Sequence, residues 1–125
     1  MKYTVDKQEK YIIIKLSNDK LDTLVAPQFK TELITMNAEG ANYIILDLAD
    51  VKFCDSSGLS AILVANRLCN QTDGAFFMCG LNDNVKKLIT ISQLDKVLNI
   101  FPTCDECIDA VFLYQLEKDL TKEQS

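Results

Sequence analysis

At the centre of the chain stands the run Val51-Lys52-Phe53-Cys54-Asp55-Ser56-Ser57-Gly58-Leu59. It lies between an apolar, strand-like segment at 43–48 and an apolar, helix-like segment at 59–69. We therefore expect a strand-to-helix corner, with one carboxylate and two hydroxyls at the start of the helix. The first N–H groups of a helix have no intrahelical partners. Such a corner suits a capping side chain, and it also suits an anion such as a phosphate.

Strand-like and helix-like segments alternate along the chain. Two extended runs open it as a hairpin and three apolar strands follow, at 3–7, 11–16, 43–48, 75–79 and 97–101. Helical patterns lie between the later strands and after the last one, beginning near positions 26, 59, 83 and 104. The order β-β-α-β-α-β-α-β-α predicts an α/β fold in which a mixed, mostly parallel sheet packs against helices.

The 125 residues of the chain match the commonest size of a single domain. We expect one domain over residues 1–118 and a polar, fraying C-terminal tail at 119–125. The N-terminus is polar and charged, unlike a signal peptide, and the longest apolar run is far shorter than the roughly 20 residues of a membrane span. The sequence therefore predicts a cytoplasmic protein.

Charge and composition exclude several classes of function. The net charge of −5 argues against nucleic-acid binding, which needs a basic surface. No block of like charges predicts a membrane anchor. The chain has no histidine, which removes Ser-His-Asp and Cys-His catalysis and most zinc sites.

The cysteines are odd in number, and most have apolar neighbours, which argues against a disulfide framework. Cys104 and Cys107 form a C-x-x-C, but they open a predicted helix after Phe101-Pro102. A thioredoxin-like pair would follow the first strand of a different chain order. We interpret these cysteines as small buried hydrophobic residues, with a redox or metal role as the alternative.

The corner itself has three interpretations. In the simplest, Asp55 or Ser56 caps the helix and Gly58 lets the backbone pass close to its neighbours. A catalytic serine is the second, but no histidine can serve as its base and no Ser-x-x-Lys spacing occurs here. The third is a serine that is phosphorylated to regulate the protein.

A resemblance favours the third interpretation. The segments F-C-D-S-S-G-L-S-A-I-L at 53–63 and G-L-N-D-N-V-K-K-L at 80–88, each after a strand, resemble the STAS domain of bacterial anti-sigma factor antagonists. The domain's name covers sulphate transporters and those antagonists. The likeness runs from Tyr3 to about Leu116 and includes the Leu21-Asp22 step before the first helix.

In that family the serine that follows the aspartate is phosphorylated, and it corresponds to Ser56 here. Cys54 stands where many relatives have a larger apolar residue, which leaves this correspondence intact. The resemblance implies a surface for partner binding made of Asp22, Asp55, Ser56, Ser57, Gly58 and Leu59. For Asp22 the alternative role is to cap the helix that begins near Ala26.

The resemblance also implies a cycle. The unmodified protein binds an anti-sigma factor that is an ATP-dependent serine kinase, and so frees a sigma factor. The kinase phosphorylates Ser56, the complex dissociates, and a serine phosphatase restores the hydroxyl. In this cycle the chain is a ligand and a substrate rather than an enzyme, and it needs no cofactor of its own because the kinase holds the nucleotide and Mg²⁺.

The chemistry of the corner suits such a switch. A phosphate adds about −1.5 to −2 charges at pH 7. We expect it to meet free N–H donors and the positive end of the helix dipole, worth about 0.3–1 kcal/mol, while the Asp55 carboxylate opposes it. These terms are small and opposed, so phosphorylation is expected to leave the fold nearly unchanged and to act on the partner surface.

The helix after the corner has more apolar surface than an ordinary amphipathic helix, so this surface is either buried or partly offered to a partner. Two rival functions remain. One is a STAS scaffold that is not phosphorylated, such as the small subunit of a transporter or lipid-transport assembly. The other, from a different class, is an enzyme with Ser56 as its nucleophile.

Overall fold

The computed structural model describes the backbone of residues 1–124 and the side chains of residues 1–121. A five-stranded sheet of order β1-β2-β4-β6-β7 forms the central layer. Its strands are β1 Tyr3–Lys7, β2 Ile12–Leu16, β4 Tyr43–Asp47, β6 Ala75–Cys79 and β7 Asn99–Phe101. β1 pairs antiparallel with β2, and all other neighbours are parallel, which confirms the predicted mixed, mostly parallel sheet.

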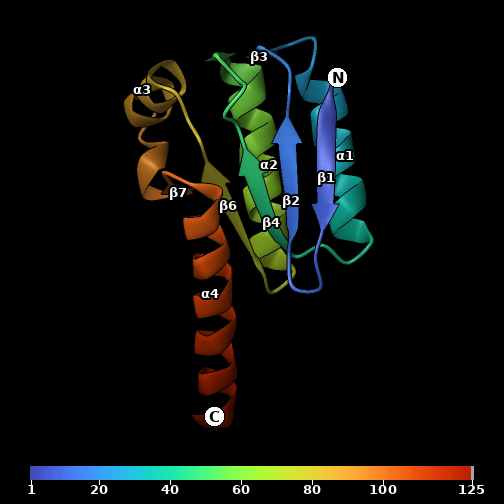
Figure 1. Cartoon of the computed structure of the whole chain (residues 1–125), viewed down its shortest axis with the longest axis vertical. Coiled ribbons are helices and arrows are strands. Elements are labelled where there is room, and N and C mark those ends of the chain that lie inside the picture. The colour runs from blue at the N-terminus through green and yellow to red at the C-terminus, as the bar shows by residue number, and fades with distance from the viewer. Residues whose placement is uncertain (125) are drawn as a thin grey trace.

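Helices cover both faces of the sheet (Figure 1). They are α1 Ala26–Ala38, α2 Ser56–Gln71, α3 Asp83–Ile91 and α4 Cys104–Gln124, with a short 3₁₀ helix η1 at Leu94–Lys96. α1 and α2 pack on one face of the sheet, and α4 packs on the other against β4, β6 and β7. The predicted α/β class is therefore confirmed.

The central strands are almost continuously apolar in sequence because both of their faces are buried. Along β4, Ile44 and Leu46 point into the core under α1 and α2, whereas Tyr43 and Ile45 point into a second core under α4. Successive side chains of a strand face opposite sides, so the middle of a strand covered on both faces is apolar at every position.

A second, two-stranded parallel sheet was not expected from the sequence. It consists of β3 Lys20–Leu21 and β5 Phe53–Cys54, each too short to produce a strand pattern. The ladder continues in a hydrogen bond from the Asp55 amide to the Leu21 carbonyl, at 3.2 Å. This small sheet brings the loop before α1 against the corner that begins α2.

Three expected boundaries differ from the structure by more than one residue. α2 begins at Ser56 rather than near position 59. The last strand is shorter than 97–101, because the amides of Val97 and Leu98 bond back to the carbonyl of Leu94 and close η1. The last helix runs past Lys118 to Gln124, since no Gly or Pro interrupts it. Most of the expected tail is thus helical, and Ser125 lies outside the described residues. The domain boundary itself stays a prediction.

Within residues 1–124, no helix is both long enough and apolar enough to cross a membrane.

Candidate functional site

Asp55 is the cap of α2. Its backbone is extended, and its Oδ1 accepts hydrogen bonds from the amides of Ser57 (2.9 Å) and Gly58 (3.0 Å). The bond from the Gly58 amide is the main cause that lowers the pKa of the Asp55 carboxyl below its usual value, because such bonds favour the charged form. Of the two capping residues considered from the sequence, the structure selects Asp55 and leaves Ser56 free of this task.

The second carboxylate oxygen of Asp55 holds the neighbouring loop. Oδ2 accepts from the amide and the hydroxyl of Thr23, both at 3.2 Å, and the Thr23 hydroxyl also lies 3.3 Å from that of Ser57. Sequence analysis missed Thr23. The two residues lie 32 positions apart, so no local pattern joins them, and the only indication was that Thr23 follows the Leu21-Asp22 step.

Ser56 is the first residue of α2, and its side chain is exposed. Within residues 1–121, its hydroxyl makes no hydrogen bond to another residue, whereas the Ser57 hydroxyl is half-buried and contacts Thr23. The two adjacent serines are therefore not equivalent. Of the two hydroxyls, that of Ser56 is the more accessible from solvent.

One expectation about a phosphate at this corner is wrong. The amides of Ser57 and Gly58, expected to be free donors, already bond to Asp55. A phosphate on Ser56 would retain the favourable field of the helix N-terminus but would have to displace Asp55 to gain these two bonds.

Gly58 and Leu59 lie beneath the corner. A Cβ added at Gly58 would sit 2.3 Å from the Leu21 carbonyl oxygen and 2.8 Å from the Cys54 sulphur, so only glycine fits. This confirms the close backbone approach expected for Gly58. Leu59 is 7% exposed and belongs to the core under α1 and α2. Both residues shape the corner from below, and a direct part in partner binding stays a prediction.

Asp22 lies in the loop next to the corner and is half-buried. Its Oδ1 accepts from the Leu24 amide at 3.1 Å, and its carbonyl accepts from the amides of Val25 and Ala26. α1 has no side-chain cap, so Asp22 forms the turn before the helix and does not cap it. Thr23, rather than Asp22, makes the direct link to Asp55.

Exposed apolar side chains flank the corner. Leu24, in the same loop as Thr23, is 89% exposed, and Phe53, on β5 two residues before Asp55, is 48% exposed. Large side chains of this kind on a well-formed surface are typical of protein contacts. Sequence analysis missed both, because neither residue stands out in an apolar pattern.

An open groove of ≈ 550 Å³ lies between α1 and α2 beside Ser56. Its lining near the corner consists of the hydroxyls of Thr23, Ser56, Ser57 and Ser60. Lys30 of α1 also lines it and is exposed. The groove therefore brings one cation to the side of the corner on which Ser56 lies.

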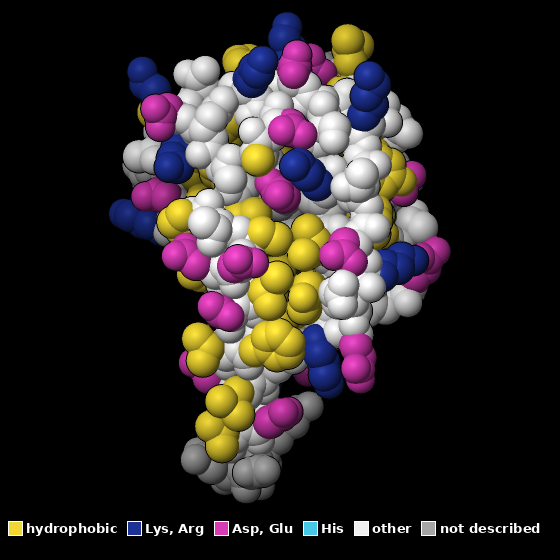
Figure 2. Space-filling view, viewed as in Figure 1, with side chains coloured by type: hydrophobic (Ala, Val, Ile, Leu, Met, Phe, Trp, Pro, Cys, Tyr) yellow, Lys and Arg dark blue, Asp and Glu magenta, His cyan; other side chains and the backbone are white. Residues whose placement is uncertain are grey.

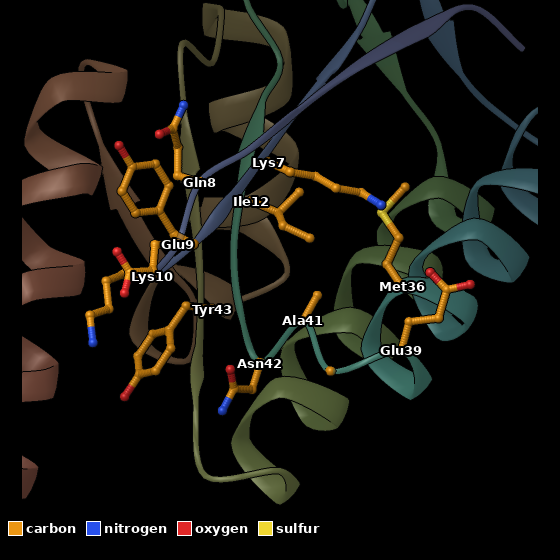
Figure 3. Close-up of a pocket in the computed structure, with 12 residues that line it drawn as sticks. Lys7, Gln8, Glu9, Lys10, Ile12, Met36, Glu39, Ala41, Asn42 and Tyr43 are labelled. Atoms are coloured by element: carbon orange, nitrogen blue, oxygen red, sulfur yellow. The ribbon is translucent and has the colours of Figure 1, made fainter.

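A smaller cavity of ≈ 260 Å³ lies at the opposite end of the sheet, between the β1–β2 turn and the end of α1 (Figure 3). Its charged lining mixes both signs: Lys7, Glu9, Lys10 and Glu39. It shares no residue with the serine corner, so the two features are separate.

The cysteine alternative gains no support. Burial raises the pKa of the Cys104 thiol to about 11, and a hydrogen bond with Cys107 raises that of Cys79. A raised pKa keeps these thiols protonated at neutral pH, and a neutral thiol is a poor nucleophile. In residues 1–121, no group of three potential metal-ligating side chains comes together.

The extra apolar surface of α2 is mostly buried. Leu59, Ala61, Ile62, Ala65 and Cys69 are all in the core. Leu63, which is partly buried, packs against it. The first of the two alternatives for this helix is therefore the one that the structure shows.

The sheet order, the two covered faces and the serine corner at the start of α2 define the class: a small α/β domain of the STAS type. The chain belongs to the STAS domain family, whose model matches residues 2–107.

Relatives and solved structures agree with this assignment. The chain is 26% identical over 93 residues to an anti-sigma-B factor antagonist of Staphylococcus aureus, a match over 74% of this chain and 85% of that protein. It is similar to an anti-sigma factor antagonist from Mycobacterium paratuberculosis, with a TM-score of 0.79, 22% identity, and 88% and 92% of the two chains covered.

It is also similar to the phosphorylated form of the Bacillus cell fate determinant SpoIIAA. The TM-score is 0.69 at 22% identity, and the match covers 88% of this chain and 99% of that one. At these identities the likeness to the solved structures shows the shared fold.

Proposed function

We propose that this protein is an anti-sigma factor antagonist that binds an anti-sigma factor with serine kinase activity and is released when Ser56 is phosphorylated. A serine phosphatase then restores the binding form. The chain acts as ligand and substrate, and its partners supply the catalysis. The cycle takes place in the cytoplasm, where sigma factors act.

One observation carries this proposal: within residues 1–121, the exposed hydroxyl of Ser56 makes no hydrogen bond, while its neighbours Asp55 and Ser57 are both engaged. Asp55 caps the helix and binds Thr23, and Thr23 contacts Ser57. A kinase needs an exposed hydroxyl on its protein substrate, and Ser56 provides one. It is also small enough to fit under a docked partner before it is modified.

The relatives support the same role. The S. aureus protein is named an anti-sigma-B factor antagonist, and SpoIIAA has been solved in a phosphorylated form. Both names describe those proteins. For this chain they favour a cycle of partner binding and phosphorylation over the scaffold and enzyme alternatives.

The physics of the switch follows from the surroundings of Ser56. A phosphate on Ser56 would add about two negative charges next to the Asp55 carboxylate. The amides of Ser57 and Gly58 already donate to that carboxylate and are not free to bind the phosphate. The added charge is therefore satisfied by solvent, and Lys30 lies on the same side. A bound partner would remove that solvent, and leaving an unpaired charge in an interface costs about 2–5 kcal/mol.

The apolar residues beside the corner provide the contact area that the polar corner lacks. Leu24 follows Thr23 and Phe53 lies two residues before Asp55, and both side chains are exposed. In this proposal they anchor the anti-sigma factor, and Ser56 lies at the edge of the contact, where a kinase active site can reach it. Large apolar side chains are the usual anchors of such interfaces.

The direct experiment uses the two adjacent serines as a matched pair. The full chain, the Ser56→Ala variant and the Ser57→Ala variant are incubated with candidate anti-sigma factor kinases, ATP and Mg²⁺, and intact masses are measured. We expect one phosphate on the wild type and on Ser57→Ala, and none on Ser56→Ala.

Other outcomes would replace the proposal. A stable complex with no mass change in any variant would support the unphosphorylated scaffold. Covalent labelling of Ser56 by an acyl or phosphonate probe would support the enzyme. If Ser57→Ala alone failed to gain a phosphate, the modified residue would be Ser57 and not Ser56.

A further inference from the structure

A second surface, separate from the serine corner, lies on α4. Leu113, Leu116 and Leu120 are 59%, 55% and 49% exposed. At spacings of three and four residues they form one stripe along the helix. Figure 2 shows hydrophobic side chains gathered along α4 and where it meets the rest of the molecule. We call this stripe and the groove beside it the α4 face.

The groove of the α4 face lies between α4 and the end of β7. Its volume is ≈ 510 Å³, and its apolar lining comes from Phe101, Ala110, Leu113 and Tyr114. Three carboxylate residues complete the lining: Glu106, Asp109 and Glu117. The α4 face thus combines apolar side chains with three carboxylates, which we call its acidic rim.

Among the described side chains of α4, no unpaired cation balances this rim. In residues 104–121 the acidic side chains are Asp105, Glu106, Asp109, Glu117 and Asp119, and the only basic one is Lys118. The Lys118 ammonium is itself paired with the Asp73 carboxylate at 2.9 Å. The described part of α4 therefore carries a net negative charge.

The opposite side of α4 holds the helix in place. Cys107 and Val111 are fully buried against the sheet, and the Tyr114 ring meets the Phe77 ring edge-on, with centroids 5.4 Å apart. The fold thus uses one side of the helix and leaves the α4 face unpartnered. The STAS family model ends at residue 107, so most of this face lies beyond the residues that the model matches.

We propose that the α4 face docks an amphipathic helix of a protein partner, with apolar residues at i, i+3 and i+7 flanked by Lys and Arg. The stripe of Leu113, Leu116 and Leu120 has the spacing at which two helices pack side by side. From Glu106 to Leu120 the face is about 21 Å long at 1.5 Å per residue, which fits a partner helix of about four turns. Basic flanks would pair with the carboxylates of the rim.

The negative charge of the α4 face argues against two other occupants. A second copy related by a two-fold axis would set the same acidic rims against each other, and like charges across an interface are unfavourable. An anionic membrane surface would be repelled for the same reason. This docking does not depend on the function proposed for Ser56.

The test uses a labelled peptide of about 15 residues, the length of the face, with leucines at i, i+3 and i+7 and lysines on both flanks. A matched peptide carries glutamate in place of each lysine. Fluorescence anisotropy with the full chain should show the lysine peptide binding at least about 10-fold tighter. The Leu116→Glu variant should lose that binding, whereas Leu24→Glu, on the far side of the molecule, should keep it.

Charge removal localises the contact further. Asp109→Asn with Glu117→Gln should weaken the lysine peptide, whereas Glu9→Gln with Glu39→Gln, at the other cavity, should not. Equal binding of both peptides, or binding that survives Leu116→Glu, would overturn the proposal. It would also be overturned if analytical ultracentrifugation showed a dimer of the chain that Leu116→Glu dissociates, because the face would then bind a second copy.

Discussion

The serine corner and the α4 face are two exposed surfaces built in opposite ways. At the corner Asp55, Thr23 and Ser57 are joined in one hydrogen-bond network, and the exposed hydroxyl of Ser56 stays outside it. On α4 the apolar side chains Leu113, Leu116 and Leu120 are exposed, and within residues 104–121 the one basic side chain, Lys118, pairs with Asp73 rather than with the carboxylates around them. The corner is rigid and offers one atom for chemistry, whereas the α4 face offers area for contact.

This contrast predicts that substitutions at the corner change stability and that substitutions on the α4 face do not. Four substitutions test this contrast, and they follow in order from the largest expected change in the free energy of unfolding to the smallest.

Gly58→Ala should have the largest effect. The new Cβ would lie 2.3 Å from the Leu21 carbonyl oxygen, and backbone cannot move aside as a flexible side chain does. We expect a loss of about 3 kcal/mol, the upper part of the range for overpacking, measured by urea denaturation. Ser60→Ala, exposed on the same helix, is the control. A loss below 1 kcal/mol at Gly58 would show that the corner is less tightly packed than the structure indicates.

Asp55→Ala comes next, because it removes the cap of α2 and both bonds to Thr23. We expect a loss of about 1–2 kcal/mol at pH 7. Asp55→Asn should recover much of this, since asparagine also caps helices, but it should alter the pH dependence.

The direction of that pH effect follows from the lowered pKa of Asp55. The pKa of the Asp55 carboxyl in the folded protein lies below its value of about 3.9 in the unfolded chain. The charged cap therefore stabilises the fold at pH values above about 3.9. This contribution is lost as the pH falls through the folded pKa. Between about pH 5 and pH 2 the wild type should therefore lose stability faster than Asp55→Asn. Parallel curves for the two proteins would contradict the assigned role of the carboxylate.

Thr23→Val tests the link between the loop and the corner. It removes the hydroxyl that lies 3.2 Å from Asp55 and 3.3 Å from Ser57, and keeps the amide bond and the shape. We expect a loss of about 1 kcal/mol, the usual net value of one hydrogen bond. Thr35→Val, on the exposed side of α1, is the matched control. An equal effect of both substitutions would mean that the Thr23 bonds contribute nothing specific.

Leu116→Gln, on the α4 face, should have the smallest effect. Its side chain is 55% exposed and lies away from the sheet, so the change should stay within about 0.5 kcal/mol. Val111→Ala, on the buried side of the same helix, should cost about 2 kcal/mol. A similar loss for both would show that the α4 face is covered within the monomer.

The sequence predicts the parts of this molecule that are governed by local rules. β4 and β6 are recognisable because both faces of each strand are buried, and the cap at Asp55 because its partners are two and three residues away. The resemblance to a family, rather than local chemistry, directed attention to Ser56 instead of Ser57.

What the sequence did not predict depends on contacts between distant segments. The Thr23–Asp55 bond joins two elements through β3 and β5, which are too short to be recognised. The exposed side of α4 was missed for a related reason. Apolar residues lie on both sides of this helix, and only the position of the sheet determines that Val111 is buried and Leu113 exposed.

The central claim is that the Ser56 hydroxyl controls partner binding without changing the fold. The most direct measurement compares the unmodified protein with the protein fully phosphorylated on Ser56, for affinity to the anti-sigma factor kinase and for the free energy of unfolding. We predict an affinity at least about 30-fold weaker, equivalent to about 2 kcal/mol, with a change in stability below about 0.5 kcal/mol. Unchanged affinity, or a loss of stability as large as the loss of binding, would contradict the account.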